Sequence, residues 1–121
     1  MVAKSLKSKL KEVGQVDAGW AIFNIVFVKT LKSGSDECFG LVDFDKYELH
    51  IDDSVSEKIL IPTLIHEIFH ILFSTVGVRA VNEDTEEEIK ITNEFIVEQA
   101  TRGLLLLKRL NPELCEILYD T

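Results

Sequence analysis

The segment 61–74 constrains the fold of this chain more than any other, because it is apolar almost throughout. Its few polar residues recur at helical spacing. On a helix they lie along one stripe, with residues four apart stacked one turn above the other: Thr63, His66, Glu67, His70 and Ser74. The segment is therefore predicted to be a buried helix with a single wet face.

Within that stripe, His66-Glu67-Ile68-Phe69-His70 has the H-E-x-x-H spacing of zinc hydrolases. Two imidazoles one turn apart can bind one metal ion, and the intervening glutamate is directed toward water that the metal activates. At this composition such a match arises by chance on the order of once in a hundred, so its context matters. The motif sits inside a helix too apolar for a surface, which favours a metal site over two core histidines that only make hydrogen bonds.

The size and charge of the chain limit the classes of protein to which it can belong. At 121 residues it is long enough for one domain and too short for two, so residues 1–121 are predicted to form a single domain. A net charge of -8 argues against nucleic acid as a partner, because phosphate binding relies on basic residues. No apolar run is expected to be long enough to span a membrane, and no signal sequence is recognised. Cys38 and Cys115 are at no ligand spacing, so free thiols and a cytoplasmic location are expected.

Three segments are predicted to be strands, over residues 20–28, 37–44 and 47–52. The first is rich in aromatic and β-branched residues and continuous enough for the centre of a sheet. A turn is predicted at 32–36, and the last two strands are joined tightly through Asp45 and Lys46. The third strand alternates in polarity, so Tyr47, Leu49 and Ile51 are expected to be buried and Glu48, His50 and Asp52 to be wet.

Helices are predicted over residues 3–13, where a strand is the alternative, around the H-E-x-x-H motif, and over 86–110 and 112–119. Gly14 and Gly77 are placed to end the first two, and 85–88 is a capping box. Pro62 lies inside the motif helix or marks its first turn. The long helix is expected to turn seven residues to the core: Ile89, Phe95, Ile96, Ala100, Gly103, Leu104 and Leu107. The predicted fold class is α+β, with a small, mostly antiparallel three-stranded sheet packed on the motif helix and a long C-terminal helix.

A catalytic zinc ion needs a third protein ligand, with the fourth position left for water. A third histidine of the metzincin kind is excluded, because Phe73 and Val76 occupy the required glycine and histidine positions. The acidic run 83–88 sits at a helix start, where it complements the dipole. Glu94 and Glu98 lie four apart among apolar residues, where carboxylates are costly unless a positive charge is near. A metal ion would supply that charge.

Residues 93–98, Asn-Glu-Phe-Ile-Val-Glu, resemble the Asn-Glu-x-x-Ser-Asp element that follows H-E-x-x-H in gluzincin metallopeptidases. The resemblance implies that Glu94 is the third zinc ligand and that Glu98 holds a zinc-bound histidine, His66 or His70, from the outer shell. Val97 in place of serine and Glu98 in place of aspartate depart from the element. Over roughly 39–114 the chain is similar to the small single-domain minigluzincin type, often encoded by phages.

The resemblance implies a zinc-dependent endopeptidase that acts on a peptide or protein substrate, with one Zn²⁺ ion and Glu67 as general base. The strand 47–52 is the expected edge for an extended peptide. Full-length gluzincins support the oxyanion from a C-terminal subdomain that this short chain lacks; His50, Tyr47 and Tyr119 are the candidate substitutes. The acidic tail 113–121 is a candidate cover that would keep the cleft latent. Two alternatives remain: a catalytically silent, metal-stabilised binding or structural domain, and a protein without metal.

Overall fold

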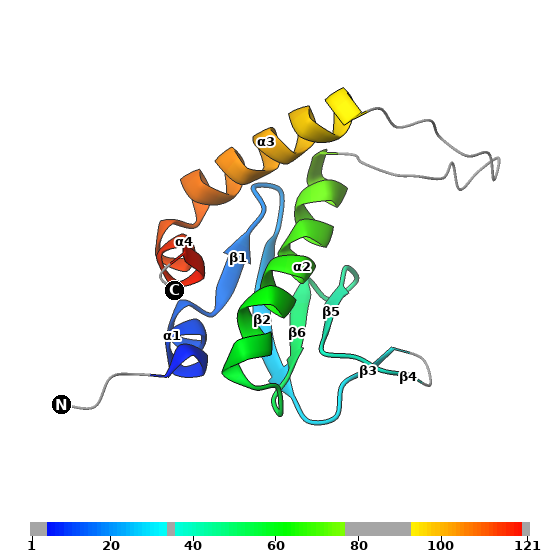
Figure 1. Cartoon of the computed structure of the whole chain (residues 1–121), viewed down its shortest axis with the longest axis vertical. Coiled ribbons are helices and arrows are strands. Elements are labelled where there is room, and N and C mark those ends of the chain that lie inside the picture. Colours follow the sequence, from blue (N-terminus) through cyan, green and yellow to red (C-terminus); the bar gives the residue numbers. More distant parts are fainter. Residues whose placement is uncertain (1–4, 34–35, 77–92, 120–121) are drawn as a thin grey trace.

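The computed structural model describes residues 5–33, 36–76 and 93–119. Within these ranges the chain is α+β, with a four-stranded mixed sheet, a second sheet of two strands and four helices (Figure 1). The strands are β1 (Gln15–Asp17), β2 (Ile22–Val28), β3 (Lys32–Ser33), β4 (Asp36–Glu37), β5 (Gly40–Asp43) and β6 (Glu48–Asp52). The helices are α1 (Leu6–Val13), α2 (Glu57–Val76), α3 (Asn93–Leu110) and α4 (Pro112–Tyr119).

The sheet has the strand order β1-β2-β6-β5. β2 and β6 run parallel, while β1 pairs antiparallel with β2 and β5 pairs antiparallel with β6. The predicted three-stranded sheet is corrected to four, because β1 is too short to carry a periodic pattern. The predicted substrate edge is also wrong: β6 lies inside the sheet, and the edge strand on that side is β5. Of the turn predicted at 32–36, residues 32–33 and 36 belong to the antiparallel pair β3–β4, and 34–35 lie outside the described residues.

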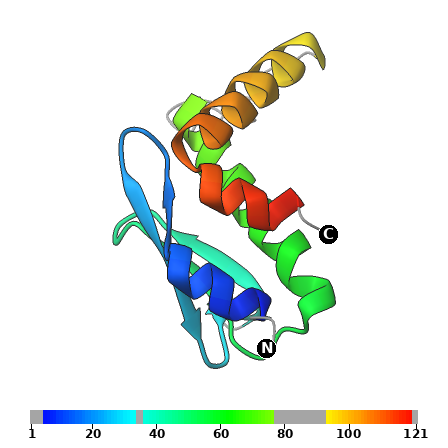
Figure 2. The ribbon, with the colours of Figure 1, turned by 90° about the vertical axis from the view of Figure 1, so that its left-hand side faces the viewer.

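The helices cover one face of the sheet, and the core lies between them (Figure 2). Leu49 and Ile51 of β6 point into this core, as the alternation predicts, and are fully buried. Tyr47 is exposed and Asp52 is buried, against expectation. The carboxylate of Asp52 accepts hydrogen bonds from the backbone N–H groups of Leu31 and Ser54, which explains how a charged group is tolerated there.

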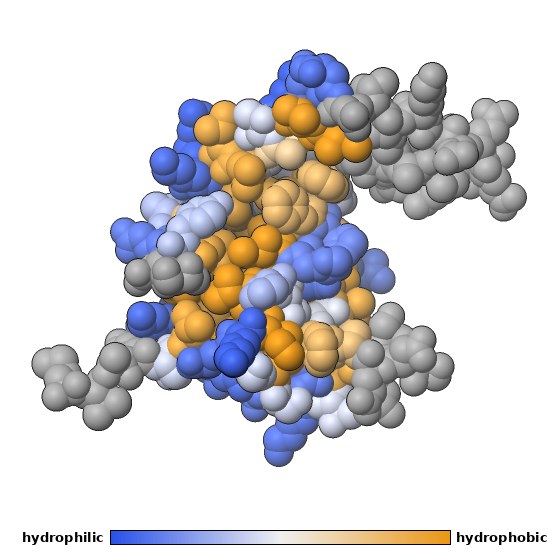
Figure 3. Space-filling view, in the orientation of Figure 1, coloured by the Kyte–Doolittle hydropathy of each residue, from blue (hydrophilic) through white to orange (hydrophobic). Residues whose placement is uncertain are grey.

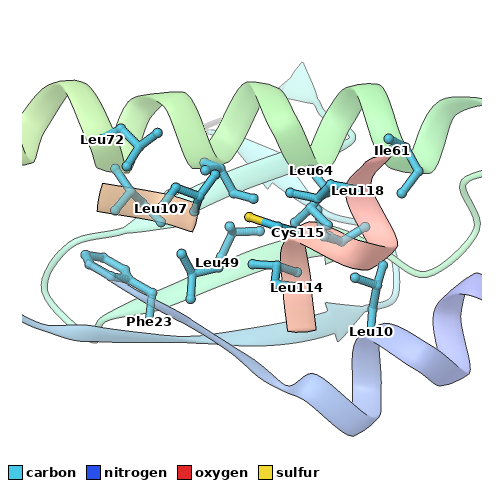
Figure 4. Close-up of a cluster of buried hydrophobic side chains, with 14 of the residues drawn as sticks. Leu10, Phe23, Leu49, Ile61, Leu64, Leu72, Leu107, Leu114, Cys115 and Leu118 are labelled. Atoms are coloured by element: carbon cyan, nitrogen blue, oxygen red, sulfur yellow. The ribbon is translucent and has the colours of Figure 1, made fainter. Parts of the chain in front are cut away.

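The two terminal helices complete the core. α1 confirms the predicted N-terminal helix, and it ends at Gly14, whose φ of 72° lies in the left-handed region that glycine adopts readily. α4 buries Leu114, Cys115 and Leu118 beneath α2, in the same cluster as Leu10 of α1 (Figure 4). The idea that this tail covers a cleft is therefore corrected, because its apolar side is already part of the core.

α2 is the core helix, and its buried residues include Leu60, Leu64, Ile68 and Ile71. Pro62 lies inside the helix, and the helix ends at Val76. Among the described residues, Glu57–Thr75 is long and apolar enough to cross a membrane by length and composition alone. The expectation that no segment approaches a membrane span is corrected by this finding. A helix that packs against a sheet in a protein core has the same apolar composition, so length and composition do not distinguish the two cases.

α3 packs on α2 only over part of its length. Gly103 lies close to Leu72 of α2, where a Cβ on the glycine would stand 3.4 Å from the leucine Cβ. Phe95, Ile96 and Leu104, predicted to face the core, are exposed instead. The N-terminal half of α3 projects beyond the end of α2 (Figure 2), and apolar side chains reach the surface over α3 (Figure 3). The predicted helix start at 85–88 and the core position at 89 lie outside the described residues.

Candidate metal centre

α2 brings three metal-ligand side chains together. Among the described residues, His66, Glu67 and His70 form a group in which one ligand atom of each lies within 4.8 Å of the others. The two histidines are exposed, and the His66 side chain retains 70% of its accessible surface. The alternative of two core histidines is therefore wrong. The predicted wet face is confirmed for His66, His70 and Ser74 and is wrong for Glu67, which is buried.

The spacing of the two imidazoles fits a shared metal ion. The Nε2 atoms of His66 and His70 are 3.2 Å apart, and the ring planes are inclined by 77°. Tetrahedral zinc with Zn–N bonds of about 2.0–2.1 Å holds two nitrogen ligands about 3.3 Å apart. Without a metal, the same distance allows one neutral imidazole to donate a hydrogen bond to the other. The donor set and its spacing therefore suit zinc, and metal binding is the property to measure.

Glu67 occupies a different environment from its neighbours. Its side chain is only 8% exposed, and its Oε1 lies 4.0 Å from Nε2 of His66. Burial raises the pKa of the Glu67 carboxyl above its usual range, while the nearby charges of His70 and His66 oppose that rise. A raised pKa increases the proton affinity of a carboxylate, which suits a general base.

Gly40, at the start of β5, lets the sheet edge approach α2. A Cβ at this position would lie 2.8 Å from Cγ of Glu67 and 2.9 Å from Cγ2 of Thr63, closer than side-chain atoms tolerate. Glycine is therefore required for β5 to lie against the base of the site. Sequence reasoning missed this residue, because nothing in one sequence distinguishes a glycine needed for close packing from a glycine in a turn.

An open pocket of about 380 Å³ adjoins the group. One wall comes from the segment leading into β5 and the other from the first half of α2. The lining residues are Cys38, Phe39, Gly40, Pro62, Thr63, His66 and Glu67. The pocket places space for a ligand beside the buried carboxylate and one imidazole, between α2 and the strand at the edge of the described sheet, β5.

The remaining predicted site residues lie elsewhere. Glu94 and Glu98 are exposed on the projecting half of α3, and Glu94 is outside the group of three. His50 contacts Oε1 of Glu48 at 2.9 Å, on the face of β6 opposite the buried Leu49. This placement gives no support to His50 as an oxyanion donor. Tyr119 is exposed on α4.

Comparison with known proteins adds nothing to this picture. No family model matches the chain, and no curated protein or solved structure shows significant similarity to it. The assignment of a function therefore depends on the metal group and its surroundings.

Proposed function

We propose that this chain is a zinc-dependent endopeptidase whose metal is held by His66 and His70 and whose general base is Glu67. The observation that carries the proposal is the 3.2 Å separation of two exposed imidazole nitrogens beside a buried carboxylate with a raised pKa. Zinc in such a site lowers the pKa of a water molecule and polarises the carbonyl that the water attacks. All three side chains of this group come from α2.

The side chains of this proposed site have separate tasks. His66 and His70 present their Nε2 atoms to the metal. Glu67 accepts the proton of the attacking water on its carboxylate and returns it to the leaving amine. Its burial against Gly40 excludes water from one side and keeps the carboxylate beside His66. The pocket next to Glu67 leaves room for substrate.

The third ligand in this proposal is Glu94. Glu98 is the positioning residue, which would accept a hydrogen bond from the ring N–H of a zinc-bound histidine. Both carboxylates are exposed on the half of α3 that projects beyond α2. Zinc binding would therefore have to draw this half of the helix toward His66 and His70. Two gains would favour this movement. The metal gains a ligand, and exposed Val97, on the same face of α3 as Glu94, can lose solvent contact.

The substrate in this proposal is an extended peptide that pairs with β5. In the described sheet β5 has a partner only on its β6 side, so its outer edge offers backbone groups for β-augmentation. Gly40, the first residue of β5, lies against the Glu67 side chain. A peptide paired with β5 would therefore pass beside the proposed base. The cytoplasmic location and the absence of nucleic-acid and membrane partners remain predictions.

A catalytically silent, metal-stabilised binding domain is the second candidate. It is favoured because, among the described residues, Glu67 is the only carboxylate grouped with the two histidines. If Glu67 is a ligand, it is no longer free to act as the general base, and two histidines alone would hold the metal weakly. In this case Glu67 would assist metal binding and no peptide would be cut.

One assay separates the two candidates. The zinc-loaded protein is incubated with a peptide library, with and without chelator, beside Glu67→Gln and the matched control Glu57→Gln from the exposed start of α2. The endopeptidase predicts chelator-sensitive cleavage that falls about 10²–10⁴-fold in Glu67→Gln, with zinc retained, and is unchanged in the control. Zinc binding without cleavage of any peptide supports the binding domain.

A further inference from the structure

We infer that Gly40 and Val42 bind an extended peptide through their backbone groups, so that the peptide is recognised at every second residue. A substrate or ligand of this chain would then exclude proline at two positions that lie two residues apart and tolerate it between them. The inference rests on the proposed function only in taking an extended peptide beside β5 as the ligand. It adds which groups of β5 bind that peptide and which peptides they exclude.

The hydrogen bonding between β5 and β6 shows which groups of β5 face outward. The N–H of Asp52 donates to the carbonyl oxygen of Phe39, 2.8 Å away. The register of the two strands, with Gly40 opposite Ile51, extends by one residue to place Phe39 opposite Asp52. These two residues therefore form a hydrogen-bonded pair. Hydrogen-bonded and non-hydrogen-bonded pairs alternate along an antiparallel ladder.

The alternation assigns a direction to each residue of β5. Leu41 and Asp43, two and four residues beyond Phe39, direct their N–H and C=O groups toward β6. Gly40 and Val42 direct theirs away from β6. In the described sheet no strand pairs with that outer side of β5, so the donor and the acceptor of each residue stay available to a ligand.

The pairing of β6 with β2 gives the same pattern from the other side. The carbonyl oxygen of Tyr47 accepts a hydrogen bond from the N–H of Asn24, and the N–H of Asp53 donates to the carbonyl oxygen of Val28. Odd-numbered residues of this strand thus bond to β2. The even-numbered residues 48, 50 and 52 are left to bond to β5, opposite residues 43, 41 and 39.

The first of the two outward-facing residues lies beside the candidate metal group. Gly40 packs so closely on α2 that a Cβ at this position would stand 2.8 Å from Cγ of Glu67. A strand paired with β5 would lie about 4.8 Å farther out. Gly40 also lines the pocket of about 380 Å³ together with His66 and Glu67. A peptide bound to Gly40 and Val42 would therefore run past the mouth of this pocket.

An antiparallel peptide would use all of these backbone groups. The peptide residues opposite Gly40 and Val42 would each exchange two hydrogen bonds with their partner, and the residue between them would make none with β5. A proline or an N-methylated residue has no N–H to donate. The loss of one backbone hydrogen bond, with a carbonyl left unpaired, lowers the affinity by about tenfold. Sensitivity at every second peptide residue is the expected signature.

The first test uses the free protein and no ligand. Amide hydrogen exchange, followed by NMR, should be at least about tenfold faster at Gly40 and Val42 than at Leu41 and Asp43, whose N–H groups bond to β6. Equal rates at the four residues, or slower exchange at Gly40 and Val42, overturn the inference.

The second test measures peptide binding to the metal-free protein by isothermal titration calorimetry, so it needs neither zinc nor cleavage. The probe is the tightest-binding member of a capped heptapeptide library, compared with analogues that each carry one N-methylated residue. We expect N-methylation to weaken binding about tenfold at two residues that lie two apart, and by less than about twofold at the residue between them. The absence of any binder, or an equal loss at every position, overturns the inference.

Two variants at one position separate the backbone from the side chain. Val42→Pro removes the outward N–H, which makes no bond to β6, so an edge strand tolerates the proline. It should weaken the probe about tenfold, whereas Val42→Ala, which keeps the N–H, should bind within about twofold of the wild type. Equal binding by the two variants overturns the inference.

The outcome for the peptide register is independent of the outcome for catalysis. Binding with sensitivity at every second residue, but without cleavage of any peptide, supports the inference while the endopeptidase proposal fails. Cleavage of peptides that bind without this sensitivity overturns the inference and leaves the endopeptidase proposal standing.

Discussion

Nε2 of His66 lies 3.2 Å from Nε2 of His70, one helical turn away on the exposed side of α2. The helix itself sets this separation, because residues four apart stack on one face. No rearrangement of the backbone is needed for both nitrogens to reach one zinc ion. The carboxylate of Glu67 lies beside this pair yet is buried, so two candidate metal ligands and a carboxylate of raised pKa share a single helix turn.

Gly40→Ala, a substitution in β5, should displace side chains of the candidate metal group on α2. The added Cβ would enter within 3 Å of the Glu67 and Thr63 side chains, so β5 must shift or the Glu67 carboxylate must move. Overpacking of this kind costs about 1–3 kcal/mol of unfolding free energy. Chemical denaturation measures that cost, and the zinc affinity should fall with it.

The neighbouring Phe39→Ala serves as its control. Phe39 is exposed, so its removal should change the unfolding free energy by less than about 0.5 kcal/mol. If Gly40→Ala is as stable as Phe39→Ala and binds zinc equally well, the close approach of β5 to α2 is wrong.

Glu94→Ala should weaken zinc binding if α3 supplies the third ligand. Loss of a direct ligand should exceed the roughly 10–100-fold loss expected for Glu98→Ala, the positioning residue. Isothermal titration with Zn²⁺ gives both affinities, and Glu113→Ala, an exposed acid of α4, controls for net charge. Should all three variants bind zinc as the wild type does, α3 contributes no ligand.

Leu114→Ala tests the role assigned to α4. Leu114 is fully buried in the core, so its truncation should cost about 2–5 kcal/mol of unfolding free energy. The matched control is Leu105→Ala, which truncates an exposed leucine of α3. It should lower the unfolding free energy by less than about 0.5 kcal/mol. A tail that merely covered a cleft would instead show a small stability change and increased peptide cleavage.

The elements that sequence predicts well are those whose pattern is local. The helix around His66, the burial of Leu49 and Ile51 and the N-terminal helix ending at Gly14 all follow from periodicity or a local stop signal. The same periodicity singles out His66 and His70 as the exposed stripe of an otherwise apolar helix.

The features that sequence missed depend on contacts between distant segments. β6 lies inside the sheet because it pairs in parallel with β2, and no pattern within β6 reveals that neighbour. Gly40 matters only because α2 crosses above it. The exposure of Phe95 and Ile96 depends on where α3 passes α2, which an apolar pattern along one helix does not specify.

Zinc content after dialysis tests the central claim most directly. The purified protein, equilibrated with Zn²⁺ and analysed by inductively coupled plasma mass spectrometry, should hold one zinc ion per chain. The double variant His66→Ala/His70→Ala should hold none, while His50→Ala, which removes the third histidine of the chain, should hold one. A wild-type protein free of zinc, or a double variant that retains it, would contradict the account.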